Sequence, residues 1–142
     1  MSTKDCHESI SYVLVQVCKV HRGSLAETLS ELGLHPGQEM ILMQLWEEDG
    51  LNQSQLVGGC RVEAPTLTKA LHRMEKAGLV ERQRDSEDAR VSRVYLTQRG
   101  RTLQESVYRC WEEVERRMVV GLTAEEKVLL RRLLMHIRSS LE

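Results

Sequence analysis

The chain has 142 residues, of which 41% are hydrophobic and 29% are charged, as expected for one globular domain with its own core. No apolar run approaches the roughly eighteen residues of a membrane-spanning helix, and the N-terminus lacks the pattern of a secretory signal, so we expect a cytoplasmic protein with no membrane partner. The formal net charge of −1, taken alone, argues against a nucleic-acid partner.

Three helices are predicted in the first part of the chain. Residues 9–32 place apolar side chains mostly three and four positions apart, which predicts a long amphipathic helix ended by Gly33. Pro36 suits the first turn of a second helix, which Asp49-Gly50 ends. Asn52 is a favourable N-cap for a short third helix.

A fourth helix and a hairpin follow. Pro65 has to lie in the first turn of that helix, because further along it would break the hydrogen-bond ladder. Residues 80–84 and 92–96 then alternate apolar and polar side chains around a polar linker, which predicts an antiparallel hairpin. The inward face of the fourth helix is expected to carry Leu67, Leu71 and Met74.

Two further helices complete the chain, one capped by Thr97 and one opened by a capping box from Thr123 to Glu126. The first, fifth and sixth helices carry more apolar surface than one small domain can cover. We therefore expect residues 1–35 and 99–142 to form a symmetric homodimer interface, with a monomeric helical cap as the alternative. The fold class is mainly α with a small β-hairpin wing: one domain over residues 1–142, containing six helices.

The order helix, turn, helix and hairpin is how a small protein places one helix in the DNA major groove and a β-ribbon beside it. Charge is segregated in the same sense. Residues 61–101 contain ten Lys/Arg and six Asp/Glu, a net +4, whereas the rest of the chain carries −5. We interpret residues 36–98 as a winged helix-turn-helix that binds double-stranded DNA, although a solvated charged surface would show the same charge distribution.

The residues expected to contact DNA come from three places. At the start of the third helix, Gln53 and Ser54 could hold a phosphate at the positive helix end. In the wing, Arg84 and Arg90 flank an acidic tip, and Asp88 could direct Arg90 into the minor groove. The outer face of the fourth helix offers hydroxyl, imidazole and cationic groups for bases and phosphates, from Thr66, Thr68, Lys69, His72 and Arg73. That face could equally be an ordinary polar surface.

These residues give the chain a resemblance to the MarR family of winged-helix regulators. The matching run is TLTKALHRMEKAGLVERQRDSEDARVSRVYLTQRG, residues 66–100. It combines a Thr-x-Thr start, a Met-Glu-x-x-Gly-Leu-Val helix end, an Asp-x-Arg wing and a Val-x-Leu-Thr-x-x-Gly second strand. The helix order on both sides fits too, so the resemblance spans nearly the whole chain.

The resemblance implies a dimer built from the first, fifth and sixth helices. It also implies binding to a pseudo-palindromic operator, usually as a repressor, with release by a small phenolic or other aromatic ligand. Two departures stand out. Ala89 occupies the wing position where the family commonly has Arg, which predicts weaker minor-groove contact. Glu63-Ala64 replaces the usual small hydroxyl residue before the recognition helix and puts a negative charge near DNA.

A ligand pocket between the first, second and fifth helices is predicted from position alone. Two of its expected residues, Met43 and Trp111, could equally be plain core. No cofactor is expected. The residues assigned to this pocket are His35, Gln38, Met43 and Trp111.

The four cysteines show no CxxC or Cys/His metal spacing. Cys18, Cys60 and Cys110 lie in apolar stripes and are interpreted as buried small apolar groups, whereas Cys6 is expected to be exposed. A peroxide-sensing branch of the family has its cysteine where Tyr12 stands here. Thiol-based redox sensing therefore remains an alternative that rests on Cys6 and Cys18. A metal-sensing branch would need histidines that the fifth helix lacks, so no metal site is predicted.

An enzyme is not expected, because the sequence has no phosphate loop, nucleophile elbow or metal-binding His pair at helical spacing. A winged helix that binds proteins is the stronger rival, given the net charge near zero. DNA binding predicts an affinity that falls steeply with salt, which a protein-interaction module would not show.

Overall fold

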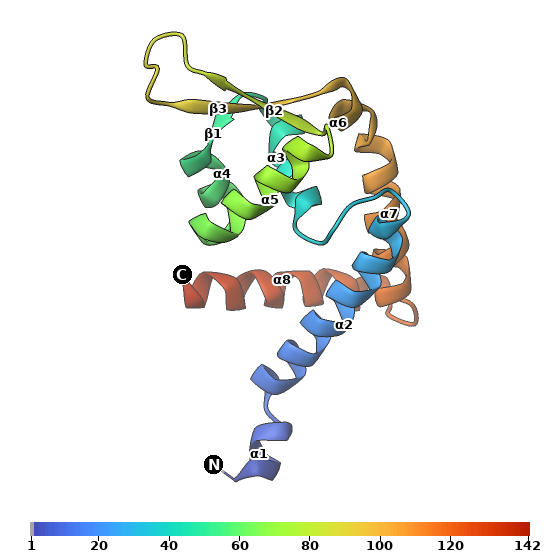
Figure 1. The fold of residues 1–142 in the computed structure, drawn as a ribbon. Helices are drawn as coiled ribbons and strands as arrows, with labels where there is room; N and C mark the ends of the chain where they lie inside the picture. The colour runs from blue at the N-terminus through green and yellow to red at the C-terminus, as the bar shows by residue number, and fades with distance from the viewer. Residues whose placement is uncertain (1) are drawn as a thin grey trace.

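The structure is a computed structural model that describes residues 2–142, and within that range it contains eight helical segments and three strands (Figure 1). The helices are α1 (Thr3–His7), α2 (Ile10–Ser30), α3 (Gln38–Glu47), α4 (Gln53–Cys60), α5 (Ala64–Lys76), α6 (Gln98–Thr102), α7 (Gln104–Met118) and α8 (Ala124–Leu141). The strands are β1 (Leu51–Asn52), β2 (Val80–Arg84) and β3 (Ser92–Leu96).

The six predicted helices correspond to α2, α3, α4, α5, α7 and α8, and the additional segments α1 and α6 have five residues each. The prediction for Pro36 was wrong: α3 begins at Gln38, after Gly37 as N-cap with φ of 100°. A turn with positive φ needs glycine, so the helix starts after it. The predicted fifth helix is divided at Leu103, with Thr97 capping the short α6 rather than α7.

The caps that the sequence predicted are present. Asn52 and Gln55 form a capping box at α4, and Thr123 and Glu126 form another at α8. Pro65 lies in the first turn of α5, where its missing N–H removes no helical hydrogen bond. These local signals fix where three of the helices begin.

The predicted hairpin is confirmed, with pairs running from Val80↔Leu96 to Arg84↔Ser92. A third strand, β1, was not predicted, and it pairs with the outer edge of β3 to give the order β1-β3-β2. Two residues are too few to show an alternating pattern. β1 follows Gly50, where φ is 76° and an added Cβ would lie 2.7 Å from a ring carbon of Tyr95, so only glycine fits there.

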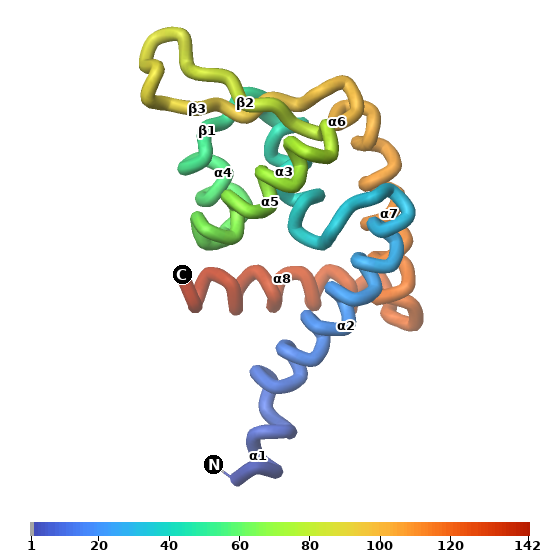
Figure 2. Tube along the Cα trace, viewed as in Figure 1, coloured from blue at the N-terminus to red at the C-terminus, as the bar shows by residue number. Residues whose placement is uncertain are grey.

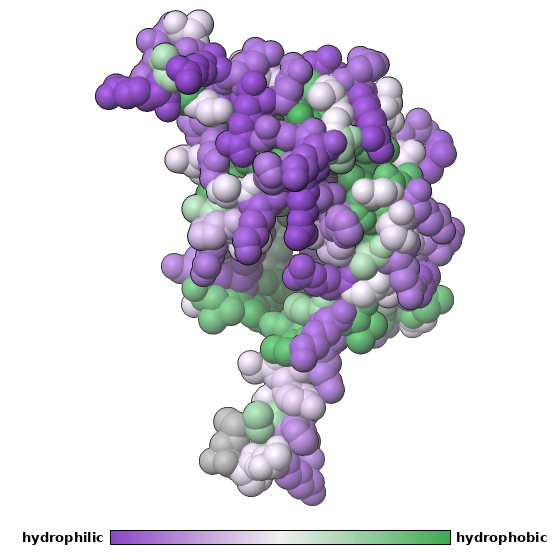
Figure 3. Space-filling model, viewed as in Figure 1, coloured by the Kyte–Doolittle hydropathy of each residue, from purple (hydrophilic) through white to green (hydrophobic). Residues whose placement is uncertain are grey.

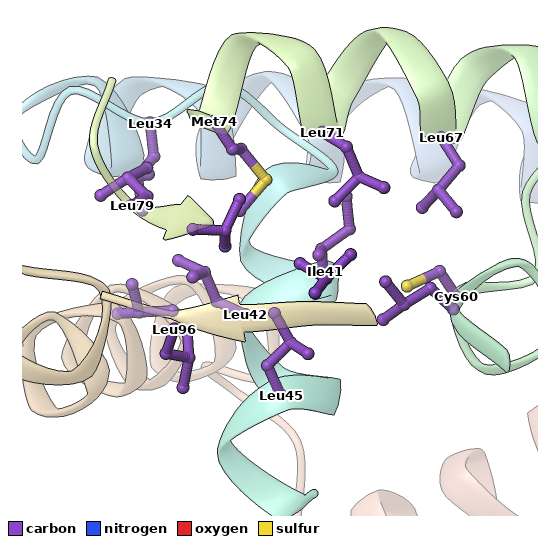
Figure 4. Packing of buried hydrophobic residues seen from close by; sticks show 14 of the residues in the cluster. Leu34, Ile41, Leu42, Leu45, Cys60, Leu67, Leu71, Met74, Leu79 and Leu96 are labelled. Atoms are coloured by element: carbon purple, nitrogen blue, oxygen red, sulfur yellow. The ribbon is translucent and has the colours of Figure 1, made fainter. Parts of the chain in front are cut away.

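The core lies between α5, α3 and the sheet (Figure 4). Leu71 and Met74 of α5 are fully buried, and Leu42 and Leu45 of α3 face them. The same cluster extends to the C-terminal half of α2 and to α7 through Leu25, Leu29, Val107 and Val114. The helix-turn-helix formed by α4 and α5, with the β2–β3 wing after it, is therefore mounted on a continuous core.

Two segments stand apart from this body, as the trace in Figure 2 shows: the N-terminal half of α2 points away from it, and α8 runs beneath α4 and α5. We call residues 10–20 and 124–141 the arms. Every residue of α8 is exposed except Ile137, which is half-buried. In Figure 3 hydrophobic residues gather in the lower part of the molecule, where α8 lies. The large exposed apolar side chains of the arms are Ile10, Val13, Val15, Val17, Val20, Val128, Leu129, Leu130, Leu133, Leu134, Met135 and Leu141.

The surplus of apolar surface predicted for the terminal helices is thus present in the single chain. An uncovered apolar surface of this extent is characteristic of an interaction face. Within residues 2–142, no helix combines the length and the apolar character needed to cross a bilayer.

Candidate nucleic-acid interface

Helix α5 presents one buried face and one cationic face. Its buried side chains anchor the helix to the core, so its opposite face is directed to solvent. Glu75, the acid within this helix, is paired with Arg82 of β2, which leaves the positive charges of the outer face uncompensated along the helix. The exposed residues of that face are Thr66, Thr68, Lys69, His72, Arg73 and Lys76.

Thr68 and Gln53 contact each other across the helix-turn-helix. The Gln53 Nε2 donates to Thr68 Oγ1 at 2.6 Å, and that hydroxyl donates to the carbonyl of Ala64 at 2.9 Å. Both residues were predicted to contact DNA, but this bond was not predicted, because it joins residues fifteen positions apart. The contact fixes the start of α4 against the first turn of α5.

The N-terminus of α4 lies beside α5, and Ser54 there is exposed. The first N–H groups of a helix have no partners within it. In α4 the capping box satisfies the N–H of Gln55 through Asn52 Oδ1 at 2.9 Å. The N–H groups of Gln53 and Ser54 therefore remain suited to a phosphate.

The tip of the wing pairs an exposed arginine with an aspartate two residues before it. Arg90 donates from Nε and from a terminal nitrogen to the two carboxylate oxygens of Asp88, at 3.1 and 3.2 Å, while its side chain stays 91% exposed. The Arg90 guanidinium, followed by the Arg90 backbone N–H, lowers the pKa of Asp88. The carboxylate thus stays charged at neutral pH, and the sequence-predicted pair exists.

Arg84 lies on the same side of the wing. Together with Arg82 and Arg90 it surrounds a hollow that also involves Ala89. The small side chain of Ala89 leaves this space open. The positively charged side chains of the wing therefore surround a hollow in its surface.

Glu63 departs from a favourable N-cap. It occupies that position in α5 without any side-chain hydrogen bond to the helix, and it is exposed. A serine or threonine there would accept from an N–H of the first turn. The interface therefore carries a negative charge that makes no capping hydrogen bond to its own helix.

Comparisons with known proteins match this geometry. A model of the MarR family matches residues 34–92. The HTH-type transcriptional regulator FarR of Neisseria gonorrhoeae is 32% identical over 132 residues, covering 92% of this chain and 88% of FarR. The chain belongs to the MarR family. It is a transcriptional regulator with a winged helix-turn-helix, as the resemblance implied.

Other MarR-family comparisons agree. The transcriptional regulator AdcR of Streptococcus pneumoniae is 35% identical over 102 residues, 72% of this chain and 69% of AdcR. A crystal structure of the S. aureus MepR–DNA complex has a TM-score of 0.81 and 24% identity, over 94% of this chain and 97% of that one. At that identity the likeness concerns the fold. The relatives named here are regulators, which favours DNA binding over the protein-interaction alternative.

A pocket in this MarR-family chain lies between α2, α3, α5 and α7. Of the four residues predicted to bind a ligand, only Trp111 lines it. His35 is exposed, Met43 is half-buried beside the core, and Gln38 is buried, with its Oε1 accepting from the His35 N–H at 3.1 Å. The structure therefore does not bring these four residues together in one pocket.

The pocket contains two buried polar groups, of which Trp111 was predicted and Glu39 was not. Glu39 is 2% exposed, and it accepts from the Gly37 N–H at 2.7 Å. Burial raises the pKa of Glu39, and the backbone N–H groups of Glu39 and Gly37, followed by the charges of Arg22 and His21, offset this only in part. The indole Nε1 of Trp111 is buried without a partner in the described chain. A ligand with a hydrogen-bond acceptor would satisfy it.

The cysteines are distributed differently from the prediction. Cys60 is buried and burial raises the pKa of its thiol, whereas Cys110 is half-buried. The prediction for Cys18 was wrong: it is exposed, because it lies in the arm formed by α2. Cys6 is exposed as expected. Within residues 2–142, no group of three or more His, Cys, Asp or Glu side chains is arranged to hold a metal.

Proposed function

We propose that this MarR-family regulator is a homodimeric repressor that binds a pseudo-palindromic duplex. In the complex α5 enters the major groove, and the wing places Arg90 in the neighbouring minor groove. The observation that carries the proposal is the Asp88–Arg90 pair, in which a guanidinium almost fully open to solvent contacts both oxygens of one carboxylate. Orientation before binding lowers the cost of association.

Within that complex each side chain has a distinct role. Lys69 and Thr66 face base edges, whereas His72, Arg73 and Arg84 contact the backbone. Gln53 and Thr68 position the two helices and, with Ser54, hold a phosphate at the start of α4. Residues 36–98 therefore form the DNA-binding part of one domain that spans residues 1–142.

The homodimer is supported by the arms and by the groove beside them. Residues 1–35 and 99–142 supply this interface. Exposed apolar side chains of α7 and α2 line a groove together, among them Val17 and Met118. A second copy related by a two-fold axis would bring the same surfaces together and bury them. The two heads would then contact half-sites about one helical turn apart, roughly 10 bp.

A small aromatic ligand is the proposed effector. The pocket beside Trp111 joins the helices of the scaffold to α5, which supplies Thr66 and Leu67 to its lining. A ligand in this pocket would therefore alter the position of α5 relative to α2 and α7. Anisotropy of a bound, labelled duplex, titrated with small phenols, tests this: release should occur with the parent chain and weaken in Trp111→Ala.

DNA binding itself is tested on a duplex selected from a random library. Its affinity should fall steeply, as a power of the salt concentration, between about 50 and 200 mM. Lys69→Ala combined with Arg90→Ala should weaken binding about 100-fold. Arg109→Ala, which removes an exposed charge on α7, is the matched control and should leave the affinity unchanged. Absence of salt-dependent binding by the parent chain would contradict the proposal and indicate a protein-interaction module.

A further inference from the structure

The two faces of the β2–β3 hairpin carry different contacts. Arg82 pairs across the hairpin with the buried Val94 and also contacts Glu75 of α5, so this face is directed toward the recognition helix. Arg93 pairs with Gln83, one position along each strand. Because side chains alternate along a strand, Arg93 lies on the opposite face. It is the cation of the wing that points away from the proposed DNA-reading surface.

Arg93 joins the tip of the wing to the body. Its Nε donates to Asp85 Oδ2 at 2.6 Å, and a terminal nitrogen donates to the carbonyl of Gly50 at 2.9 Å. Gly50 is itself fixed, since its N–H donates to the carbonyl of Val94 at 3.0 Å. The guanidinium therefore spans from the turn before β1 to the first residue after β2. We call Asp85, Arg93 and the Gly50 carbonyl the brace.

Asp85 in turn organises the tip. Its Oδ1 accepts from the N–H groups of Glu87 and Asp88, at 2.7 and 3.3 Å. The N–H of Glu87, followed by Arg93, lowers the pKa of Asp85. Asp88 then holds Arg90 through both of its carboxylate oxygens. A continuous series of hydrogen bonds and backbone links thus leads from the body of the protein to the exposed guanidinium.

We propose that Asp85 and Arg93 are positioning residues for the wing: the brace holds the tip at a fixed distance from α5, so that Arg90 meets the minor groove when α5 occupies the major groove. This inference rests on the proposed function of the wing. Neither residue needs to touch DNA. Their effect is preorganisation, because an unbraced tip would have to be ordered each time the protein bound.

Two other roles for Arg93 fit the geometry less well. A direct phosphate contact would have to come from the face of the hairpin opposite to the one that contacts α5, using the N–H donors that Asp85 and Gly50 leave free. An ordinary surface ion pair contributes little and is usually well exposed. Here the Asp85 side chain is only 14% exposed, and its oxygens serve both the guanidinium and the backbone of the tip.

The test is a double-mutant cycle between the brace and Arg90, measured as duplex affinity. Arg93→Gln and Asp85→Asn should each weaken binding about tenfold, since they release Arg90. Asp85→Asn keeps an oxygen for the backbone N–H groups, so it removes the ion pair and leaves the turn. Arg93→Lys keeps the positive charge but cannot bond Asp85 and the Gly50 carbonyl from two separate nitrogens. Its duplex affinity should therefore lie between those of Arg93→Gln and the parent chain.

The decisive comparison is made in the Arg90→Ala background. There, Arg93→Gln should cost almost nothing, because the side chain that the brace positions is gone. A tenfold loss in both backgrounds would overturn the proposal in favour of direct contact. No loss in the parent background would overturn it in favour of an ion pair without function. Arg109→Gln removes the exposed partner of Glu105 on α7 and should have no effect in either background.

Hydrogen exchange without DNA separates the brace from the proposed function. In Arg93→Gln, amides of residues 85–91 should exchange at least about tenfold faster, while those of α5 stay protected and the melting temperature changes little. Unchanged exchange at the tip would contradict the brace even if the chain binds DNA. If exchange accelerates but the parent chain binds no duplex, the brace exists and the proposed function fails.

Discussion

The head (residues 36–98) and the arms are built from the same kind of amphipathic helix, but only the head covers its apolar face. Leu71 and Met74 of α5 are fully buried against α3 and the sheet. In the arms, Ile10 is 78% exposed and Val128 is 72% exposed. One chain thus completes the DNA-reading surface and leaves the arms open. If the proposed second copy binds, this difference predicts that it binds to the arms.

The head is also closed by polar contacts between distant segments. The indole Nε1 of Trp46 donates to the carbonyl of Gly100 at 3.1 Å, and Asp49 Oδ1 accepts from the N–H of Leu96 at 2.9 Å. An added Cβ on Gly100 would lie 2.3 Å from the Leu79 carbonyl oxygen, so the chain segments meet closely there. The contact between the head and the end of α8 is different, because Arg61 and Glu142 form an ion pair that is exposed to solvent.

The largest expected effect comes from charging an arm. Leu133→Asp should convert the protein to a monomer and weaken duplex binding about 100-fold or more, because two linked half-sites are replaced by one. Light scattering after size exclusion measures the first effect and anisotropy the second. Ser139→Asp, at an exposed polar position of the same helix, should leave both unchanged. A dimer that persists in Leu133→Asp would contradict the proposal that the apolar residues of the arms form the dimer interface.

A core substitution should affect the head at every protein concentration. Leu71→Ala removes a fully buried side chain and should lower the free energy of unfolding by about 2–5 kcal/mol. Leu129→Ala, in an arm, should lower the melting temperature by an amount that depends on protein concentration. Thermal unfolding over a hundredfold concentration range distinguishes them. If the melting temperatures of both variants depended equally on protein concentration, the arms would not be stabilised by association any more than the head is.

A cap substitution should improve the head. Glu63→Ser supplies the missing side-chain acceptor at α5 and should raise stability by about 1 kcal/mol. It also removes a negative charge near DNA, so affinity should rise several-fold. At α4, where the cap is already present, Asn52→Ala should cost a similar free energy. A destabilised Glu63→Ser chain would contradict this prediction and mean that the charge of Glu63 at the N-terminus of α5 stabilises the helix more than a serine cap does.

The smallest effect concerns pH. Burial holds the pKa of Glu39 above its ordinary 4.5, so the protonated form is favoured by folding and stability falls as pH rises through the folded pKa. Glu39→Gln, which keeps an acceptor for the Gly37 N–H, should therefore raise the melting temperature at pH 7 and lose this advantage below pH 4.5. Glu125→Gln on the exposed α8 should show neither effect.

The local features of this fold could be predicted from the sequence. The caps at Asn52 and Thr123, the place of Pro65 and both wing strands depend on neighbouring residues, and each was expected. The Asp88–Arg90 pair was expected for the same reason, since only one residue separates its members. Short-range sequence patterns are sufficient for contacts of this kind.

Contacts between distant residues could not be predicted. The Gln53–Thr68 bond and the pairing of Arg93 with Gly50 depend on how elements pack, and no spacing in the sequence encodes them. Of the residues predicted for the ligand pocket only Trp111 lines the pocket between α2, α3, α5 and α7, because which side chains meet there depends on how these helices pack. Cys18 was expected inside because its stripe is apolar, and a sequence pattern does not tell which partner covers such a stripe.

The most direct test of the central claim is a hydroxyl-radical footprint of the selected duplex, combined with the number of chains bound per duplex. Two chains should protect two regions roughly 10 bp apart, with additional minor-groove protection flanking them that disappears in Arg90→Ala. One chain per duplex would contradict binding as a dimer. Flanking protection that survives the loss of Arg90 would contradict insertion of Arg90 into the minor groove.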